Sequence, residues 1–137
     1  MEIRKAIPKD EKEISEMYYQ LYPNFKGPKN LISTNKITAK VLSFVAEDGG
    51  EVVGFIIGTF IMYGASKYGY LEELYVKEAF RRKGIGGQLI NRILDEYKKL
   101  ETWALFVMTK ETDAIAQAFY NKMGFMKSKG LWLYKEL

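Results

Sequence analysis

The sequence contains no cysteine and no histidine among its 137 residues. The absence of cysteine excludes disulfides, thiolate nucleophiles and thiolate metal ligands. The absence of histidine removes imidazole both as a metal ligand and as a general base. Any catalysis must therefore depend on carboxylate, tyrosine, lysine, hydroxyl or backbone groups, and we expect no metal site.

Long apolar runs and a strong excess of one charge are also missing. No apolar run approaches the roughly 18 residues that a membrane span requires, and the first stretch, MEIRKAIPKDEKE, is charged throughout. We therefore expect a soluble cytoplasmic protein. The 21 Lys and Arg exceed the 17 Asp and Glu by a net charge of only +4. This mild bias suits an anionic ligand without requiring nucleic acid.

The order of expected elements is that of one α/β domain. The length suits a single domain, and residues 1–137 contain no repeat, low-complexity segment or linker. The expected strands lie at 2–7, 43–47, 52–63, 70–76 and 103–108, with a final hairpin at 125–137 that turns near Lys129 and Gly130. The expected helices lie at 10–22, 37–42, 85–97 and 113–123. The helix at 85–97 has an apolar stripe made of Ile85, Leu89, Ile90, Ile93, Leu94 and Tyr97. We therefore predict one mixed sheet with helices packed on it.

Two local patterns in the strands are informative. The residues AspGlyGly at 48–50 stand between two apolar runs and predict a hairpin. In the strand at 70–76, alternation places Leu71 and Glu73 on one face, and Glu72 and Leu74 on the other. Each face of this strand should thus carry one glutamate.

Residues 81–87 read RRKGIGG and stand between the strand at 70–76 and the helix at 85–97. Unpaired amide groups at the start of a helix point at an anion, and the helix dipole favours negative charge there. Glycine lets the backbone come close, while arginine and lysine reach phosphate oxygens directly. A dinucleotide fingerprint needs glycine where Leu89 stands, and the P-loop spacing also fails. The stretch predicts a phosphate-binding loop of another kind, or else a helix start with a solvated basic loop.

Two segments together resemble the GNAT superfamily of N-acetyltransferases. Arg81-x-x-Gly84-x-Gly86, preceded by the strand YLEELYV, is similar to the acyl-CoA signature of that superfamily. The segment AFYNKMGF at 118–125 is similar to its second motif, a helix that carries a tyrosine and ends in Gly-Phe before a strand. IRKA near the start and Val53-Gly54-Phe55 extend the resemblance over essentially the whole chain.

The resemblance implies a single GNAT domain over 1–137 that binds acetyl-CoA. The α+β fold would have a mixed, mostly antiparallel sheet of about six to seven strands flanked by about four helices. The strands at 70–76 and 103–109 would splay apart, with the pantetheine arm in the gap and the pyrophosphate on the loop. The residues that the resemblance assigns to the cofactor are Leu74, Tyr75, Val76, Arg81, Arg82, Lys83, Gly84, Ile85, Gly86 and Gly87.

The resemblance also implies catalytic roles. Glu72 stands where diamine acetyltransferases with a Leu-Glu-Asp strand have their base, and it would deprotonate the amine, through ordered water. Glu73 is the alternative base, and either glutamate could instead pair with a lysine. Tyr120 matches the general acid and would protonate the CoA thiolate, unless it is only a core residue. The backbone amide near Tyr75 or Val76 would donate to the oxyanion.

One position departs from the family pattern. The family usually carries asparagine, which contacts the pantetheine, where this chain has Asp113. Asp113 or Thr112 can cap the helix expected at 113–123, since aspartate is an ordinary cap. A contact between Asp113 and CoA is therefore left open.

The acceptor is less determined than the donor. It is either a small cationic amine, such as a polyamine, diamine or aminoglycoside, or else a protein amino terminus or lysine. Acidic and aromatic residues could wall a site for a cationic amine: Glu13, Glu16, Glu72, Glu73, Tyr18, Tyr19 and Tyr22. Alternatively, Glu13 and Glu16 form the solvated face of the first expected helix. A non-catalytic CoA sensor is the alternative outside the enzymes, and RNA binding is disfavoured because an RNP-type strand and a basic stripe are missing. We expect no nucleic-acid or membrane partner and leave a homodimer open.

Overall fold

The computed structural model describes residues 38–63, 66–130 and 132–136, together with Arg4, Lys9, Lys12, Glu16, Met17 and Pro23. The strand expected at 2–7 and the helix expected at 10–22 lie almost entirely outside the described residues. The acceptor residues suggested at 13, 18, 19 and 22 lie outside them as well. The chain divides into two compact units, Met1–Val107 and Met108–Leu137.

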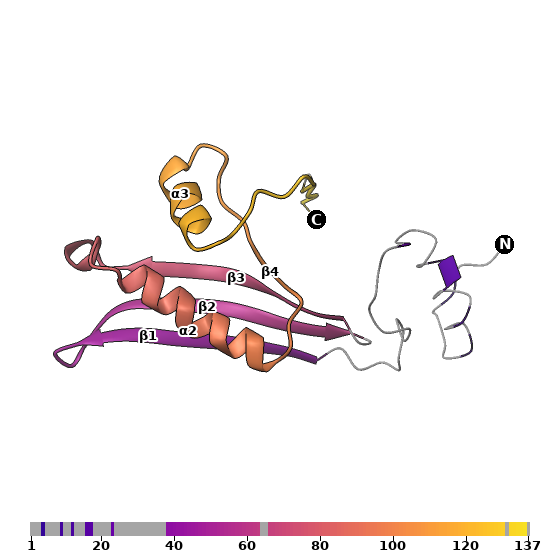
Figure 1. The fold of residues 1–137 in the computed structure, drawn as a ribbon, viewed down its shortest axis with the longest axis horizontal. Helices are drawn as coiled ribbons and strands as arrows, with labels where there is room; N and C mark the ends of the chain where they lie inside the picture. The colour runs from indigo at the N-terminus through magenta and orange to yellow at the C-terminus, as the bar shows by residue number, and fades with distance from the viewer. Residues whose placement is uncertain are drawn as a thin grey trace. The chain divides into compact units, whose positions relative to one another are not determined.

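The first unit is built on a mixed sheet, which Figure 1 shows with its strands in the order β1-β2-β3-β4. The strands β1 (Thr38–Asp48), β2 (Glu51–Tyr63) and β3 (Ser66–Val76) are antiparallel neighbours. The short strand β4 (Ala104–Val107) runs parallel to β3. The predicted mixed, mostly antiparallel character is confirmed, and the described residues supply four of the predicted strands.

The strand β1 corrects one prediction and confirms another. The helical segment expected at 37–42 is wrong, because Thr38–Asp48 is one continuous strand that pairs with β2 from Thr38↔Met62 onward. Backbone pairing along β2 outweighs the weak helical pattern of so short a segment. The hairpin predicted at 48–50 is confirmed, since β1 and β2 meet there and both glycines have positive φ.

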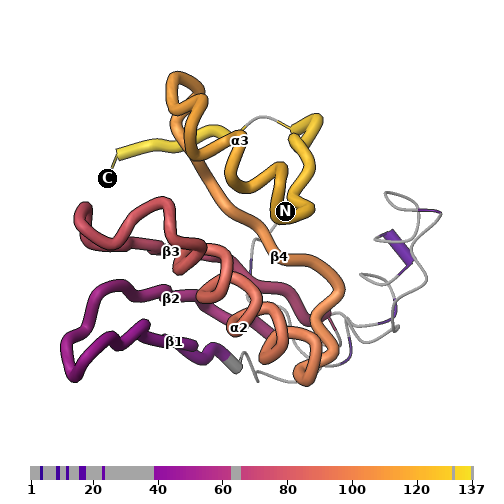
Figure 2. Tube along the Cα trace, turned by 60° about the vertical axis from the view of Figure 1, so that its left-hand side comes forward, coloured from indigo at the N-terminus to yellow at the C-terminus, as the bar shows by residue number. Residues whose placement is uncertain are grey.

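The helix α2 (Ile85–Lys99) lies along one face of the sheet formed by β1, β2 and β3, as Figures 1 and 2 both show. Its buried side chains confirm the predicted apolar stripe; they are Leu89, Ile90, Ile93 and Tyr97. The sheet contributes the buried residues Ile56, Phe60 and Leu71 to the same core. Burial of this apolar surface is the main term that stabilises the unit.

Tyr97 comes closer to the sheet than the rest of α2. A β carbon at Gly58 would lie 2.4 Å from the Tyr97 hydroxyl oxygen, and one at Gly69 would lie 2.4 Å from Cε1 of the same ring. Glycine inside a strand often marks such a close approach. The Tyr97 ring therefore fits against the sheet only because Gly58 and Gly69, on neighbouring strands, have no side chain.

The second unit contains α3 (Ala114–Lys122). Asp113 caps it, because its Oδ1 accepts a hydrogen bond from the Ala116 amide at 2.9 Å, and Gly124 follows the helix with positive φ. Both predicted ends are thus confirmed. The final hairpin is wrong for residues 125–130 and 132–136, which form no strand. In the described part of the chain, no helix is long and apolar enough to cross a membrane.

Replacing Gly58 with alanine should destabilise the protein. The new β carbon would lie 2.9 Å from Ile93 Cδ1 and 3.0 Å from the Tyr70 carbonyl oxygen, as well as against the Tyr97 hydroxyl. Overpacking of this kind costs about 1–3 kcal/mol, which urea denaturation measures as a lower free energy of unfolding. The control is Gly130→Ala, whose β carbon would meet nothing nearer than Ser128 Oγ at 3.5 Å. Equal stability of the two variants would contradict the close packing of α2 on the sheet.

Candidate active site

The strand β3 contains a β-bulge at Glu72. Glu73 opposes Ile57 on β2 while Leu71 opposes Gly58, so Glu72 is an extra residue with no partner of its own. A bulge of this kind bends the strand and re-aims the side chains beside it. The strict alternation expected along 70–76 therefore does not hold.

Glu72 and Glu73 share the face of the sheet that points away from α2. Thr59, whose neighbour Gly58 faces Tyr97, donates a hydrogen bond from Oγ1 to Glu72 Oε1 at 2.6 Å. Glu73 opposes Ile57, which lies on the same face of β2 as Thr59 because side chains two residues apart point the same way. The prediction of one glutamate on each face is wrong, because the bulge interrupts the alternation.

Both carboxylates are exposed and unneutralised. Neither Glu72 nor Glu73 forms an ion pair with any residue that the structure describes, so the pairing with lysine considered from the sequence does not occur there. Within the same described residues, no group of three or more acidic side chains is placed to hold a metal ion. Among the residues that the structure describes, the two exposed glutamates thus have no cationic side chain paired with them.

Among the residues that the structure describes, β3 has a neighbouring strand on one side only beyond the bulge. Its pairing with β4 runs from Tyr68↔Ala104 to Leu71↔Val107, whereas β3 itself continues to Val76. This end of pairing is what the predicted splay between the two strands requires. The segment from Glu72 to Val76 thus has an open edge on the β4 side.

The register indicates which backbone groups this edge offers. The Lys77 amide donates to the Val53 carbonyl at 2.8 Å, which identifies a hydrogen-bonded pair of the β2–β3 ladder. Bonded and non-bonded pairs alternate along an antiparallel ladder. Tyr75 therefore directs its amide and carbonyl toward β2, whereas Leu74 and Val76 direct theirs toward the open edge.

Arg81 links the basic loop to that edge. Its Nε donates to the Val76 carbonyl at 2.8 Å, which agrees with the outward direction of that carbonyl. Its guanidinium carbon lies 5.6 Å from the centroid of the Tyr75 ring. Arg81 thus positions the loop that follows the short 3₁₀ helix η2 (Glu78–Phe80), besides being a candidate ligand for phosphate.

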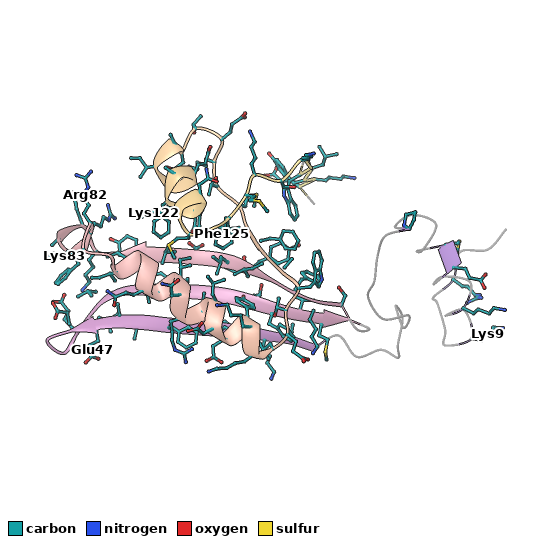
Figure 3. The ribbon with its side chains drawn as sticks, in the orientation of Figure 1. Lys9, Glu47, Arg82, Lys83, Lys122 and Phe125 are labelled. Carbon is teal, nitrogen blue, oxygen red and sulfur yellow. The ribbon has the colours of Figure 1, made fainter. Side chains whose placement is uncertain are left out.

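The loop itself presents unpaired amide groups. Arg82 and Gly84 adopt positive φ values of 62° and 80°, and Gly84 is the N-cap of α2 without a side-chain cap. The first helical bond joins the Gln88 amide to the Gly84 carbonyl at 3.1 Å. In the described part of the chain, the amides from Arg82 to Gly87 donate to no backbone carbonyl. Figure 3 shows the side chains of Arg82 and Lys83, which belong to this loop, at one end of the sheet. Unpaired amides, positive φ values and basic side chains at the start of a helix are compatible with a phosphate-binding loop, and the binding of phosphate stays a prediction.

Tyr120, the predicted acid, lies on α3 in the second unit and is half-buried. Its ring packs edge-on against Phe119 and Phe125, with centroids 5.3 and 5.5 Å away. Asp113 at the start of the same helix acts as its cap. The interpretation of Asp113 as an ordinary cap is therefore confirmed.

Sequence reasoning missed Thr59 and Tyr97. The Tyr97 hydroxyl lies 2.9 Å from the Thr59 carbonyl oxygen and 3.1 Å from that of Tyr70. Burial, and next the negative charge of Glu72, raise the pKa of Tyr97 above its ordinary value, so the hydroxyl stays protonated and remains a donor. The available signal was the pair of glycines at 58 and 69 within long apolar strands.

Known protein families, sequences and solved structures match most of this chain. Residues 11–125 match the family described as Acetyltransferase (GNAT) family. The D-amino-acid N-acetyltransferase HPA3 of Saccharomyces cerevisiae is 28% identical over 93% of this chain and 87% of that protein. N-alpha-acetyltransferase 30 of Xenopus laevis is 31% identical over 68% of this chain, but the match spans only 34% of that protein.

Solved structures share the fold at lower identity. An aminoglycoside acetyltransferase from an uncultured soil metagenomic sample, in complex with sisomicin, has a TM-score of 0.65 and 21% identity over 99% of this chain and 95% of that one. The aminoglycoside N-acetyltransferase AAC(6')-Iy in complex with CoA has a TM-score of 0.62 and 20% identity, covering 98% and 93% of the two chains. At these identities the likeness concerns the fold.

Proposed function

Since this chain belongs to the acetyltransferase (GNAT) family and is an acetyl-CoA-dependent N-acetyltransferase, we propose that its acceptor is the primary amine of a small cationic molecule. The observation that carries this proposal is the presence of Glu72 and Glu73 on one exposed face without an ion pair in the described residues. Opposite charge attracts a protonated amine, and two adjacent carboxylates favour an acceptor with more than one positive charge. Polyamines, diamines and aminoglycosides have that character.

The proposed binding site of the CoA pyrophosphate is the loop at 81–87 together with the start of α2. The amides from Arg82 to Gly87 are unpaired in the described structure and stand at the positive end of the fifteen-residue helix α2. The exposed side chains of Arg82 and Lys83 add cationic groups beside them. Acetyl-CoA supplies the acetyl group as a thioester when it is bound.

The open edge of β3 is the proposed binding site of the pantetheine arm. Its outward groups are the amide and carbonyl of Leu74 and the amide of Val76, since the Val76 carbonyl already accepts from Arg81. Of the two amides considered from the sequence, Val76 is the better oxyanion donor, because the Tyr75 amide is directed toward β2. A fixed donor aimed at developing negative charge is the usual means of stabilising an acyl-transfer transition state.

The remaining steps are proton transfers. Glu72 accepts a proton from the ammonium group, through ordered water, so that the neutral nitrogen attacks the thioester carbonyl carbon. The Val76 amide donates to the resulting oxyanion. As the carbon–sulfur bond breaks, Tyr120 donates a proton to the sulfur, and the nitrogen releases its remaining extra proton, which returns Tyr120 to its neutral form. Transfer is direct between two bound substrates, because the chain has no cysteine to carry the acetyl group.

The acceptor class is tested by acetyl transfer itself. The protein is incubated with isotopically labelled acetyl-CoA and, separately, with polyamines, aminoglycosides, amino acids and peptides with free amino termini, and the products are identified by mass spectrometry. We expect label on a primary amine of a polyamine or an aminoglycoside. Label on peptide amino termini alone would contradict the proposed acceptor and favour the alternative suggested by the N-alpha-acetyltransferase relative.

Glu72→Gln should slow acetyl transfer most near neutral pH. An aliphatic amine with a pKa of about 10 holds its proton there, so the base contributes most, by roughly 10²- to 10⁴-fold. The defect should shrink as the pH rises and the free amine becomes abundant. Steady-state rates from pH 7 to 10 provide the measurement, with Glu73→Gln as the matched control that lacks this dependence. A defect of Glu72→Gln that stays constant across pH would move the base to Glu73 or to water.

Tyr120→Phe should keep the fold and lose the proton for the leaving thiolate. The ring contacts with Phe119 and Phe125 remain, so the thermal midpoint should change little. The rate should fall by about 10² to 10⁴ at all pH values, while the KM for acetyl-CoA stays near that of the wild type. A fully active variant would leave Tyr120 with a packing role only.

A further inference from the structure

The Tyr97 hydroxyl joins two facing strands next to the bulge. It lies 2.9 Å from the carbonyl oxygen of Thr59 and 3.1 Å from that of Tyr70. These two residues oppose each other on β2 and β3, and only the pair Gly58↔Leu71 separates them from Glu72. One hydroxyl shared between two facing carbonyls therefore fixes both strands at this point of the ladder.

The packing around Tyr97 makes this position specific. The ring fills the space above Gly58 and Gly69, where any side chain would collide with it, and it is only 2% exposed. Strand glycines weaken a sheet, since they add no packing of their own. Here two glycines on neighbouring strands lie beneath one buried ring. Their lack of a side chain allows the Tyr97 hydroxyl to reach the two strand carbonyl oxygens.

Thr59 connects this contact to Glu72. Its carbonyl oxygen accepts from Tyr97 on the α2 side, and its side-chain hydroxyl donates to Glu72 Oε1 at 2.6 Å on the opposite face. A shift of register by one residue would move the side chains of a strand to the other face. If the Thr59–Tyr70 pair loosened, Thr59 would move relative to β3. The bulge and the hydrogen bond from the Thr59 hydroxyl to the Glu72 carboxylate would then both change.

We propose that Tyr97 is a positioning residue for acetyl transfer, which holds the Thr59–Tyr70 pair and through it keeps Glu72 at the bulge. The proposal rests on the proposed role of Glu72 as the base. Tyr97 lies on the α2 side of the sheet and acts on the reaction only through Thr59 and the backbone of β3.

A double-mutant cycle between Tyr97→Phe and Glu72→Gln tests this link. Tyr97→Phe keeps the ring and removes the hydroxyl, so with Glu72 present kcat should fall by about ten- to a hundredfold, as expected for a misplaced catalytic group. The KM for acetyl-CoA should stay unchanged, because the loop at 81–87 is untouched. In the Glu72→Gln background the same change should lower kcat by less than about twofold. An equal fall in both backgrounds would overturn the proposal.

A matched control separates positioning from general loss of stability. Ile90→Val removes one methyl group from a fully buried side chain of the same helix that is not among the atoms nearest to Gly58 or Gly69, and it should leave kcat unchanged. Thr59→Val, which removes the donor to Glu72, should reproduce the loss of kcat at constant KM and serves if Tyr97→Phe does not fold.

Amide hydrogen exchange measures the bulge without any catalysis. The amides of Leu71, Glu72 and Glu73 should exchange faster in Tyr97→Phe than in Ile90→Val, with either residue at position 72. If Glu72→Gln proves fully active, the proposed base is wrong, and exchange alone then decides the role of Tyr97. Unchanged exchange at the bulge in Tyr97→Phe would overturn the proposal whatever the activity of Glu72→Gln.

Discussion

The bulge at Glu72 is the constraint on which the rest of the candidate site depends. One unpaired residue in β3 brings Glu72 and Glu73 to the same exposed face, where an unbroken strand would separate them. It also lies where β3 continues beyond the last residue paired with β4. The bulge therefore coincides with the two features on which the proposed function rests, a pair of exposed carboxylates on one face and outward backbone groups on one edge.

The open edge of β3 and the loop at 81–87 are two groups of backbone hydrogen-bond donors, separated by the bonded amides of Lys77, Phe80 and Arg81. Outward amides at Leu74 and Val76 are followed by the unpaired amides from Arg82 to Gly87, and Arg81 connects the two segments through the Val76 carbonyl. Backbone donors of this kind bind an anionic, amide-containing ligand without a particular side chain.

Local signals made much of the fold predictable. The apolar stripe of α2, the hairpin at 48–50 and the cap at Asp113 each depend on residues close in sequence, and all three are confirmed. The strand nature of 38–42 and the bulge at Glu72 depend on the partner strand β2, which a local pattern does not contain, and both were missed. The glycines and the helix start at 81–87 were visible in the sequence for the same reason as the hairpin, whereas the shared face of the two glutamates and the hydrogen bonds of Tyr97 to two strand carbonyls follow from strand pairing and packing.

The position of CoA on the protein tests the central claim most directly. A crystal structure of the protein with CoA should place pyrophosphate oxygens within about 3.2 Å of amide nitrogens between Arg82 and Gly87. The pantetheine arm should form hydrogen bonds with the backbone of Leu74, on the edge that faces away from β2. A pyrophosphate bound elsewhere, with these amides still unpaired, would contradict the account.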